Sequence, residues 1–215
     1  MHDAPEIAGQ LERRRSAVAA EWGLTDEVVL IGSGDLISIP GRADLTYPFR
    51  AHSEYVYLTD RNRPGGVLAF DPGEGWVDFV APVTESDRLW SGEPPGGLDG
   101  TTTSALDRWL AARRSRPLAV LGSPVPGSPV PGESADGELT DRLRLALSQV
   151  RRPKDAVELH RMRIAAQATR AAFAAVMPML AEGVSEREAQ IELEAAAFRH
   201  GGEAMASKAI GAERW

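Results

Sequence analysis

The 215-residue sequence contains no cysteine. This absence excludes disulfide bonds, thiolate metal ligands and a cysteine nucleophile. No apolar run approaches the roughly 18 residues that a membrane-spanning helix needs. The N-terminal stretch MHDAPEIAGQLERRR also lacks the apolar core of a secretion signal. We therefore expect a cytoplasmic protein without a membrane partner.

Several catalytic signatures are missing as well. Gly32-Ser33-Gly34 follows an apolar run, but it lacks the third glycine of a dinucleotide fingerprint and the Gly-Lys-Ser/Thr of a phosphate loop, so it is interpreted as a turn. No two histidines stand at His-x-x-x-His spacing, and His200 with Glu203 makes only a weak metal-binding pair. A Gly-x-Ser-x-Gly elbow is absent too. The residues alone predict an α/β protein with a following helical hairpin and do not predict its function.

Charge is unevenly distributed along the chain. Residues 1–150 carry 14 arginines and 22 acids, whereas residues 151–215 carry 10 basic and 9 acidic residues. An acidic surface argues against nucleic acid as a partner, because phosphate binding needs a basic face. The texture of the sequence also changes near Pro153. We therefore expect two regions, residues 1–150 and residues 151–215, with the boundary near Pro153.

Hydrophobic periodicity predicts the elements of both regions. Strands with short turns between residues 55 and 80 would form an antiparallel meander, and the tandem repeat SPVPG-SPVPG between residues 122 and 132 would form a stiff surface loop. Expected helices are 5–22, 102–114, 139–150, 155–180 and 186–199. Expected strands are 28–31, 36–39, 55–59, 67–70, 76–80 and 118–121, with a possible strand start at 209–210.

An ordered series of motifs resembles the creatinase/aminopeptidase P family. The segment DLTYPFRAHSEYVYLTDRNRPGGVL (44–68) is similar to the Tyr-Pro-Phe-Arg, acid and aromatic-rich stretch of the family's N-terminal domain. Leu89-Trp90-Ser91-Gly92 resembles its Trp-x-Gly. Residues 150–159 resemble its crossing into the catalytic domain, and residues 162–165 and 183–186 resemble the continuation. The likeness runs over residues 8–212 in the family's order.

This resemblance implies a fold and an activity. The fold would be a mixed-sheet α/β N-terminal domain with flanking helices, followed by the first helices of a truncated α+β pita-bread catalytic domain. The activity would be that of an Xaa-Pro aminopeptidase, a hydrolase that removes an N-terminal residue preceding proline. Family members use two divalent metal ions, commonly manganese, which generate a hydroxide and polarise the scissile carbonyl. They bind these metals through two Asp, one His and two Glu.

No aspartate follows Asp155 in this chain, so the family's pair of Asp ligands is absent from it. We expect no metal ligand and no catalytic residue within residues 1–215, and no activity from this chain alone. A half-made domain would expose apolar faces of helices 155–180 and 186–199, so we also expect association, with a homo-oligomer as the family implies. Alternatives are a non-catalytic module for oligomerisation and substrate gating, or a fragment left by truncation or proteolysis.

Three substrate-binding residues are implied by the resemblance. Trp90 resembles a tryptophan that lines the pocket beyond the proline across a subunit interface, where an indole offers a flat apolar wall. Asp44 resembles an acid that faces a neighbouring subunit's site, and Arg151 an arginine that closes the pocket at the domain junction. Each has a plainer alternative. Trp90 would cap the small core, Asp44 would be a turn residue, and Arg151 would pair with Asp155 on the helix that it introduces.

Overall fold

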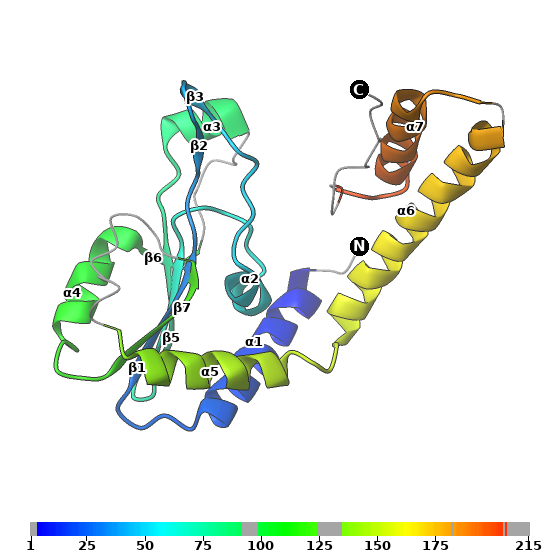
Figure 1. The fold of residues 1–215 in the computed structure, drawn as a ribbon. Coiled ribbons are helices and arrows are strands. Elements are labelled where there is room, and N and C mark those ends of the chain that lie inside the picture. Colours follow the sequence, from blue (N-terminus) through cyan, green and yellow to red (C-terminus); the bar gives the residue numbers. More distant parts are fainter. Residues whose placement is uncertain (1–3, 92–98, 124–134, 182, 204, 206–215) are drawn as a thin grey trace. The chain divides into compact units, whose positions relative to one another are not determined.

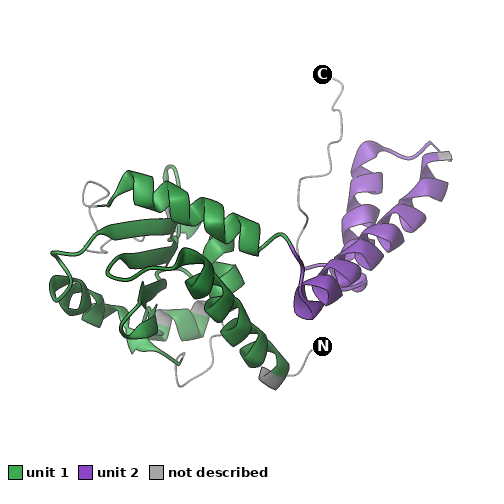
Figure 2. Cartoon of the chain, turned by 90° about the horizontal axis from the view of Figure 1, so that it is seen from below, with its two compact units in different colours: residues 1–152 green, residues 153–215 purple. Residues whose placement is uncertain are grey.

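The computed structural model describes residues 4–91, 99–123, 135–181, 183–203 and 205. Within them the chain divides into two compact units, residues 1–152 and residues 153–215 (Figure 2). The helices are α1 (Ala4–Trp22), α2 (Ser53–Thr59), α3 (Glu85–Ser91), α4 (Leu106–Ala111), α5 (Gly137–Val150), α6 (Ala156–Ala181) and α7 (Glu186–Arg199), with a 3-10 turn at Thr103–Ala105. The strands are β1 (Val28–Ser33), β2 (Ser38–Ile39), β3 (Arg42–Thr46), β4 (Val67–Asp71), β5 (Gly75–Val80), β6 (Thr101–Thr102) and β7 (Leu118–Ser123).

The first unit is built around a five-stranded mixed sheet in the order β6-β5-β4-β1-β7, with β2 and β3 as a separate ribbon (Figure 1). Strand β1 pairs antiparallel with β4 and parallel with β7, and β5 pairs antiparallel with β4 and parallel with β6. The expected mixed-sheet α/β fold is therefore confirmed. The expected three-strand meander is wrong, because only β4 and β5 of that stretch are strands and β1 lies beside them.

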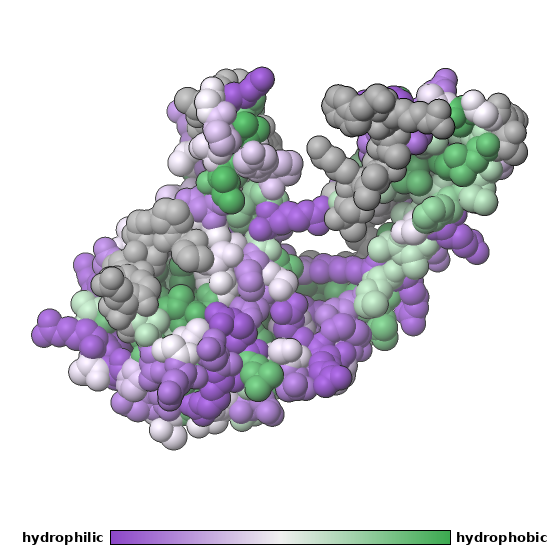
Figure 3. Space-filling model, viewed as in Figure 1, coloured by the Kyte–Doolittle hydropathy of each residue, from purple (hydrophilic) through white to green (hydrophobic). Residues whose placement is uncertain are grey.

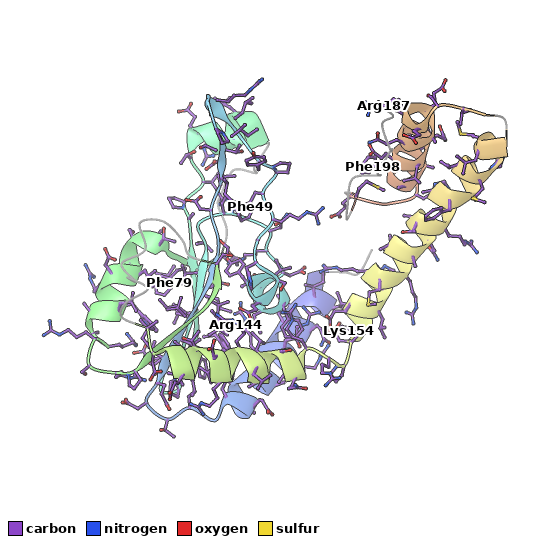
Figure 4. The ribbon with its side chains drawn as sticks, viewed as in Figure 1. Phe49, Phe79, Arg144, Lys154, Arg187 and Phe198 are labelled. Atoms are coloured by element: carbon purple, nitrogen blue, oxygen red, sulfur yellow. The ribbon has the colours of Figure 1, made fainter. Side chains whose placement is uncertain are left out.

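Alternating side chains of the sheet supply two apolar layers. One face carries the larger core, where Val29 and Ile31 pack with side chains of α1, α2 and α5. The opposite face carries Leu30 and Phe79 against α4, with Phe79 and Trp109 in an edge-to-face contact (Figures 1 and 4). The central strands β1 and β4 are thus buried on both faces, as expected for a sheet with helices on both sides.

Helix α2 is the largest departure from the sequence-based expectation, which makes residues 55–59 a strand. His52 begins the helix by accepting the Glu54 N–H at Nδ1, and Asp60 ends it in the left-handed conformation. Tyr55 and Leu58 are buried in the larger core. A packed helical face therefore overrides the strand preference of Tyr, Val and Thr. Burial, and then the charge of Asp78, raises the pKa of Tyr55 to about 12, so this phenol is neutral.

Smaller departures concern the ends of elements. The helix expected over 102–114 is shorter, with α4 following a 3-10 turn. The expected turn at Gly32-Ser33-Gly34 begins later, since Gly32 and Ser33 belong to β1. Residues 88–92, which follow the meander in the sequence, lie largely in α3. Most of the SPVPG repeat lies outside the described residues. The possible strand start at 209–210 lies entirely outside them.

The second unit is a helical hairpin. Small side chains of the two helices, Ala172 on α6 and Ala196 and Ala197 on α7, form its core. Ser185 begins α7 with a reciprocal capping box, in which it and Glu188 satisfy each other's backbone N–H. Within the described ranges, no helix combines the length and apolarity needed to cross a membrane.

Helices α6 and α7 expose large apolar side chains, as the sequence predicts. Figure 3 shows apolar side chains along α6. The exposed large hydrophobic residues of this unit are Leu159, Met162, Phe173, Met177, Leu180, Ile191 and Phe198. Ala172 of α6 packs with Ala196 and Ala197 of α7, whereas the larger apolar side chains named above are exposed.

Candidate functional site

Arg151 is the one predicted site residue whose side chain the structure describes. It is the C-cap residue of α5, and its N–H donates to the Leu147 carbonyl. Its Nη1 donates to Ser53 Oγ at 3.3 Å, and its guanidinium carbon lies 5.3 Å from the centre of the Tyr57 ring. Both partners belong to α2, about a hundred residues earlier in the chain. Arg151 is thus placed on a defined surface of the first unit.

Asp155, the partner weighed for Arg151 in the plainer alternative, has a capping role. Its Oδ1 accepts the Glu158 N–H at 2.9 Å, and its own N–H donates to Glu158 Oε2 at 3.2 Å. This reciprocal pair satisfies two backbone donors at the start of α6. Lys154 lies 3.8 Å from the other oxygen of Glu158. The segment between the units is therefore bordered by a C-cap on one side and an N-terminal capping pair on the other.

Helix α2 also carries a buried carboxylate that the sequence did not reveal as special. Glu54 is 6% exposed and accepts the Gly122 N–H at 2.7 Å. Its Oε1 lies 3.7 Å from Nε of Arg144 on α5, and its Oε2 lies 3.5 Å from Nδ1 of His52. Because charged and amide donors surround it, this carboxylate ties α2 to the end of β7 and to α5.

The end of β7 is unusually close to β1 at Gly122. Gly122 has φ +72°, and a Cβ there would lie 2.2 Å from the Gly32 carbonyl oxygen. Only glycine fits this position, because both the backbone conformation and the space exclude a side chain. The close approach places the Gly122 N–H where Glu54 accepts it.

Asp44 and Trp90 lie on β3 and α3 respectively. Figure 1 shows both elements toward the same end of the first unit. Their side chains are outside the described part of the structure. Their proposed contacts with substrate, and the plainer alternatives, stay predictions.

The residues that the structure describes do not fit a two-metal centre. They contain no group of three or more His, Asp or Glu side chains arranged to hold a metal ion. His52 and Glu54 come near each other, but the Glu54 oxygens face Arg144 and the Gly122 N–H. His200 has its Nδ1 2.8 Å from the Ala196 carbonyl oxygen at the end of α7.

A second electrostatic cluster lies where β4 ends. Asp71 is 3% exposed and accepts from Arg113 Nε at 2.6 Å and from Arg116 Nη1 at 2.8 Å. Its other oxygen accepts the Gly73 N–H at 2.8 Å. Hydrogen bonds from Arg116 are the largest cause that holds the pKa of Asp71 far below its ordinary value. Burial opposes this effect in part, and the hydrogen bond from Arg113 adds to it. Asp71 therefore stays ionised in the folded state and joins the sheet to the segment after α4.

Residues 11–114 match the family described as "Aminopeptidase P, N-terminal domain". The likeness continues beyond this domain, because Xaa-Pro aminopeptidase 1 of Streptomyces coelicolor is 29% identical over 217 residues that include 87% of this chain. These two findings support a likeness of this chain to the creatinase/aminopeptidase P family. The same figures apply to Xaa-Pro aminopeptidase 1 of Streptomyces lividans. The chain spans 42% of the length of either of these family members.

Solved structures of the aminopeptidase P family share the fold. Aminopeptidase PepP of Pseudomonas aeruginosa superimposes with a TM-score of 0.60 at 22% identity, covering 90% of this chain and 49% of that one. Zinc-substituted Escherichia coli aminopeptidase P in complex with product gives a TM-score of 0.60 at 20% identity, with 90% and 50% coverage. At these identities the likeness concerns the fold alone.

Proposed function

We propose that this chain forms the N-terminal part of an Xaa-Pro aminopeptidase-type metallopeptidase, which releases an N-terminal residue that precedes proline. The observation that carries the proposal is the continuity of the likeness to the Streptomyces Xaa-Pro aminopeptidases, which extends beyond residues 11–114 over 87% of the chain. Residues 1–150 would be the N-terminal domain and residues 151–215 the beginning of the catalytic domain. The enzyme would act on proline-containing peptides in the cytoplasm as a homo-oligomer.

In this proposal the chain supplies substrate-binding residues and not the metal centre. Arg151, Asp44 and Trp90 would line the substrate site, and two divalent ions, manganese by the family resemblance, would be held by residues outside this sequence. The sequence has no aspartate after Asp155, so it lacks the pair of Asp ligands that the family resemblance implies. The 215-residue chain alone would therefore be inactive.

The test compares two purified proteins, the 215-residue chain and the product of the whole open reading frame that encodes it. Both are incubated with manganese and an Xaa-Pro-Xaa peptide, with the matching Xaa-Ala-Xaa peptide as control. We expect the whole product to release the first residue of the proline peptide only, and the 215-residue chain to release none. Release by the 215-residue chain would show that it holds a complete catalytic centre. Failure of the whole product would refute the peptidase proposal.

A non-catalytic module for oligomerisation and substrate gating is the second candidate. It is favoured by the exposed apolar face of α6, since contiguous exposed apolar surface marks interaction sites. A whole product that associates through this face and never cleaves peptides would support it.

A further inference from the structure

One face of α2 holds the side chain of Arg151. Ser53 and Tyr57 are four residues apart in this helix, so their side chains lie on the same face. Arg151 contacts both, through a hydrogen bond of 3.3 Å to Ser53 Oγ and a guanidinium carbon 5.3 Å from the Tyr57 ring centre. Tyr57 is only 9% exposed. A cation over an aromatic ring is held more strongly when the contact is shielded from water.

Tyr57 is itself fixed from the side of α1. The guanidinium carbon of Arg14 lies 4.7 Å from the centre of the Tyr57 ring, and Arg14 Nη1 donates to the Tyr57 carbonyl at 2.9 Å. Arg14 is 5% exposed. The bond from Gly122 N–H to Glu54 joins the same helix to the sheet. Arg151 therefore rests on a ring whose position is set by the core of the first unit.

We infer that Tyr57 and Ser53 are positioning residues for Arg151. Arg151 caps α5 and is followed by Arg152 and Pro153, where the chain passes into the second unit. Proline has a fixed φ and also restricts the residue before it, so few conformations are open to this segment. The contacts with α2 therefore fix the guanidinium of Arg151 beside Arg152 and Pro153, where the connection to the second unit begins. The consequence for substrate binding rests on the proposed function, in which Arg151 closes the substrate pocket.

Trypsin provides a test that does not depend on peptidase activity. Cleavage after Arg151 requires its side chain to leave α2 and enter the S1 pocket of the protease. Cleavage after Lys154 requires opening of the same segment but leaves Arg151 in place, and Pro153 blocks cleavage after Arg152. The measured quantity is the ratio of the two cleavage rates, followed by mass spectrometry of the fragments from the 215-residue chain.

The variants are Tyr57→Leu, which removes the ring, and Tyr57→Phe, which keeps it. We expect Tyr57→Leu to raise the Arg151-to-Lys154 ratio roughly two- to five-fold, the factor that a cation–π contact provides. Tyr57→Phe should restore the ratio of the original chain. Ser53→Ala removes only the hydrogen bond at the helix start, so it tests the inference if Tyr57→Leu fails to fold, and it should raise the ratio by a smaller factor. An unchanged ratio in both Tyr57→Leu and Ser53→Ala, or an equal rise with Tyr57→Phe, would overturn the inference.

The functional consequence is tested separately in the product of the whole reading frame. There, Tyr57→Leu should raise KM for an Xaa-Pro peptide more than it lowers kcat, and Tyr57→Phe should leave both unchanged. A changed trypsin ratio with an unchanged KM would retain the positioning of Arg151 and refute its role in substrate binding. An inactive whole product would refute the proposed function, while the trypsin ratio would still decide the positioning.

Discussion

Replacing Asp71 by asparagine removes the charge that two arginines share at the end of β4. Arg113, whose side chain is 8% exposed, and Arg116 would both face an amide that has no charge and only one accepting oxygen, in place of the two carboxylate oxygens to which they now donate. Breaking a buried ion pair by removing one partner lowers the free energy of unfolding by about 3–5 kcal/mol. Glu74 remains near Arg113 and Asp26 near Arg116. We therefore expect the lower end of this range, about 3 kcal/mol.

The stabilisation by Asp71 should also depend on pH. The pKa of Asp71 is lowered in the folded state, so its stabilisation is fully present above the unfolded value of about 4 and is lost as the pH falls through the folded pKa. The asparagine side chain that replaces it does not titrate. The difference in free energy of unfolding between the original chain and Asp71→Asn should therefore be largest near neutral pH and should shrink steadily as the pH falls below about 4.

Urea unfolding followed by tryptophan fluorescence measures this difference, since Trp22 and Trp76 pack together beside Phe70 on β4. Asp87→Asn is the matched control. The Asp87 side chain is 38% exposed and pairs with Arg63 at 3.3 Å. Its replacement should lower the free energy of unfolding by less than about 1 kcal/mol. Equal effects of the two substitutions, or an Asp71→Asn effect that stays constant down to low pH, would show that the ionised Asp71 carboxylate does not stabilise the fold through Arg113 and Arg116.

Three further predictions concern other parts of the chain. Gly122→Ala should lower the free energy of unfolding by about 3–5 kcal/mol in urea titrations, because the added Cβ would overlap the Gly32 carbonyl at a position with positive φ. Gly137→Ala is the control. No atom lies within 4 Å of its added Cβ, so it should change the free energy of unfolding by less than about 1 kcal/mol. Glu54→Ala should lower it by about 2–3 kcal/mol, since it removes the acceptor of the Gly122 N–H, and an unchanged urea midpoint would contradict this role. Phe173→Ser combined with Met177→Ser should reduce the mass of this chain in light scattering, because both residues lie on the exposed apolar face of α6; a monomeric original chain at high concentration would contradict the expected association.

The sequence predicted those elements whose periodicity agrees with their packing. Leu139, Leu143 and Leu147 recur every four residues, and all three are buried on one face of α5. The strand predicted from Tyr55 to Thr59 is wrong. Its residue types favour a strand, but the segment packs as a helix between α1 and the sheet. The signals for a helix were present at its ends, in His52 as N-cap and Asp60 as C-cap.

The candidate site was predictable only in part. Family motifs pointed to Arg151, but its contacts with Ser53 and Tyr57 join residues almost a hundred positions apart, which no local pattern reveals. The same holds for Glu54, whose partners on β7 and α5 come together only in the folded unit. A glutamate in a short aromatic segment gave no indication that it would be buried, because burial depends on the partners that the fold supplies.

We propose above that this chain is the N-terminal part of a metallopeptidase whose metal ligands lie outside it. The nucleotide sequence downstream of codon 215 is the decisive measurement. We predict that the reading frame continues into a segment that contains two Asp, one His and two Glu suited to bind two metal ions. A stop codon directly after codon 215 would contradict the claim.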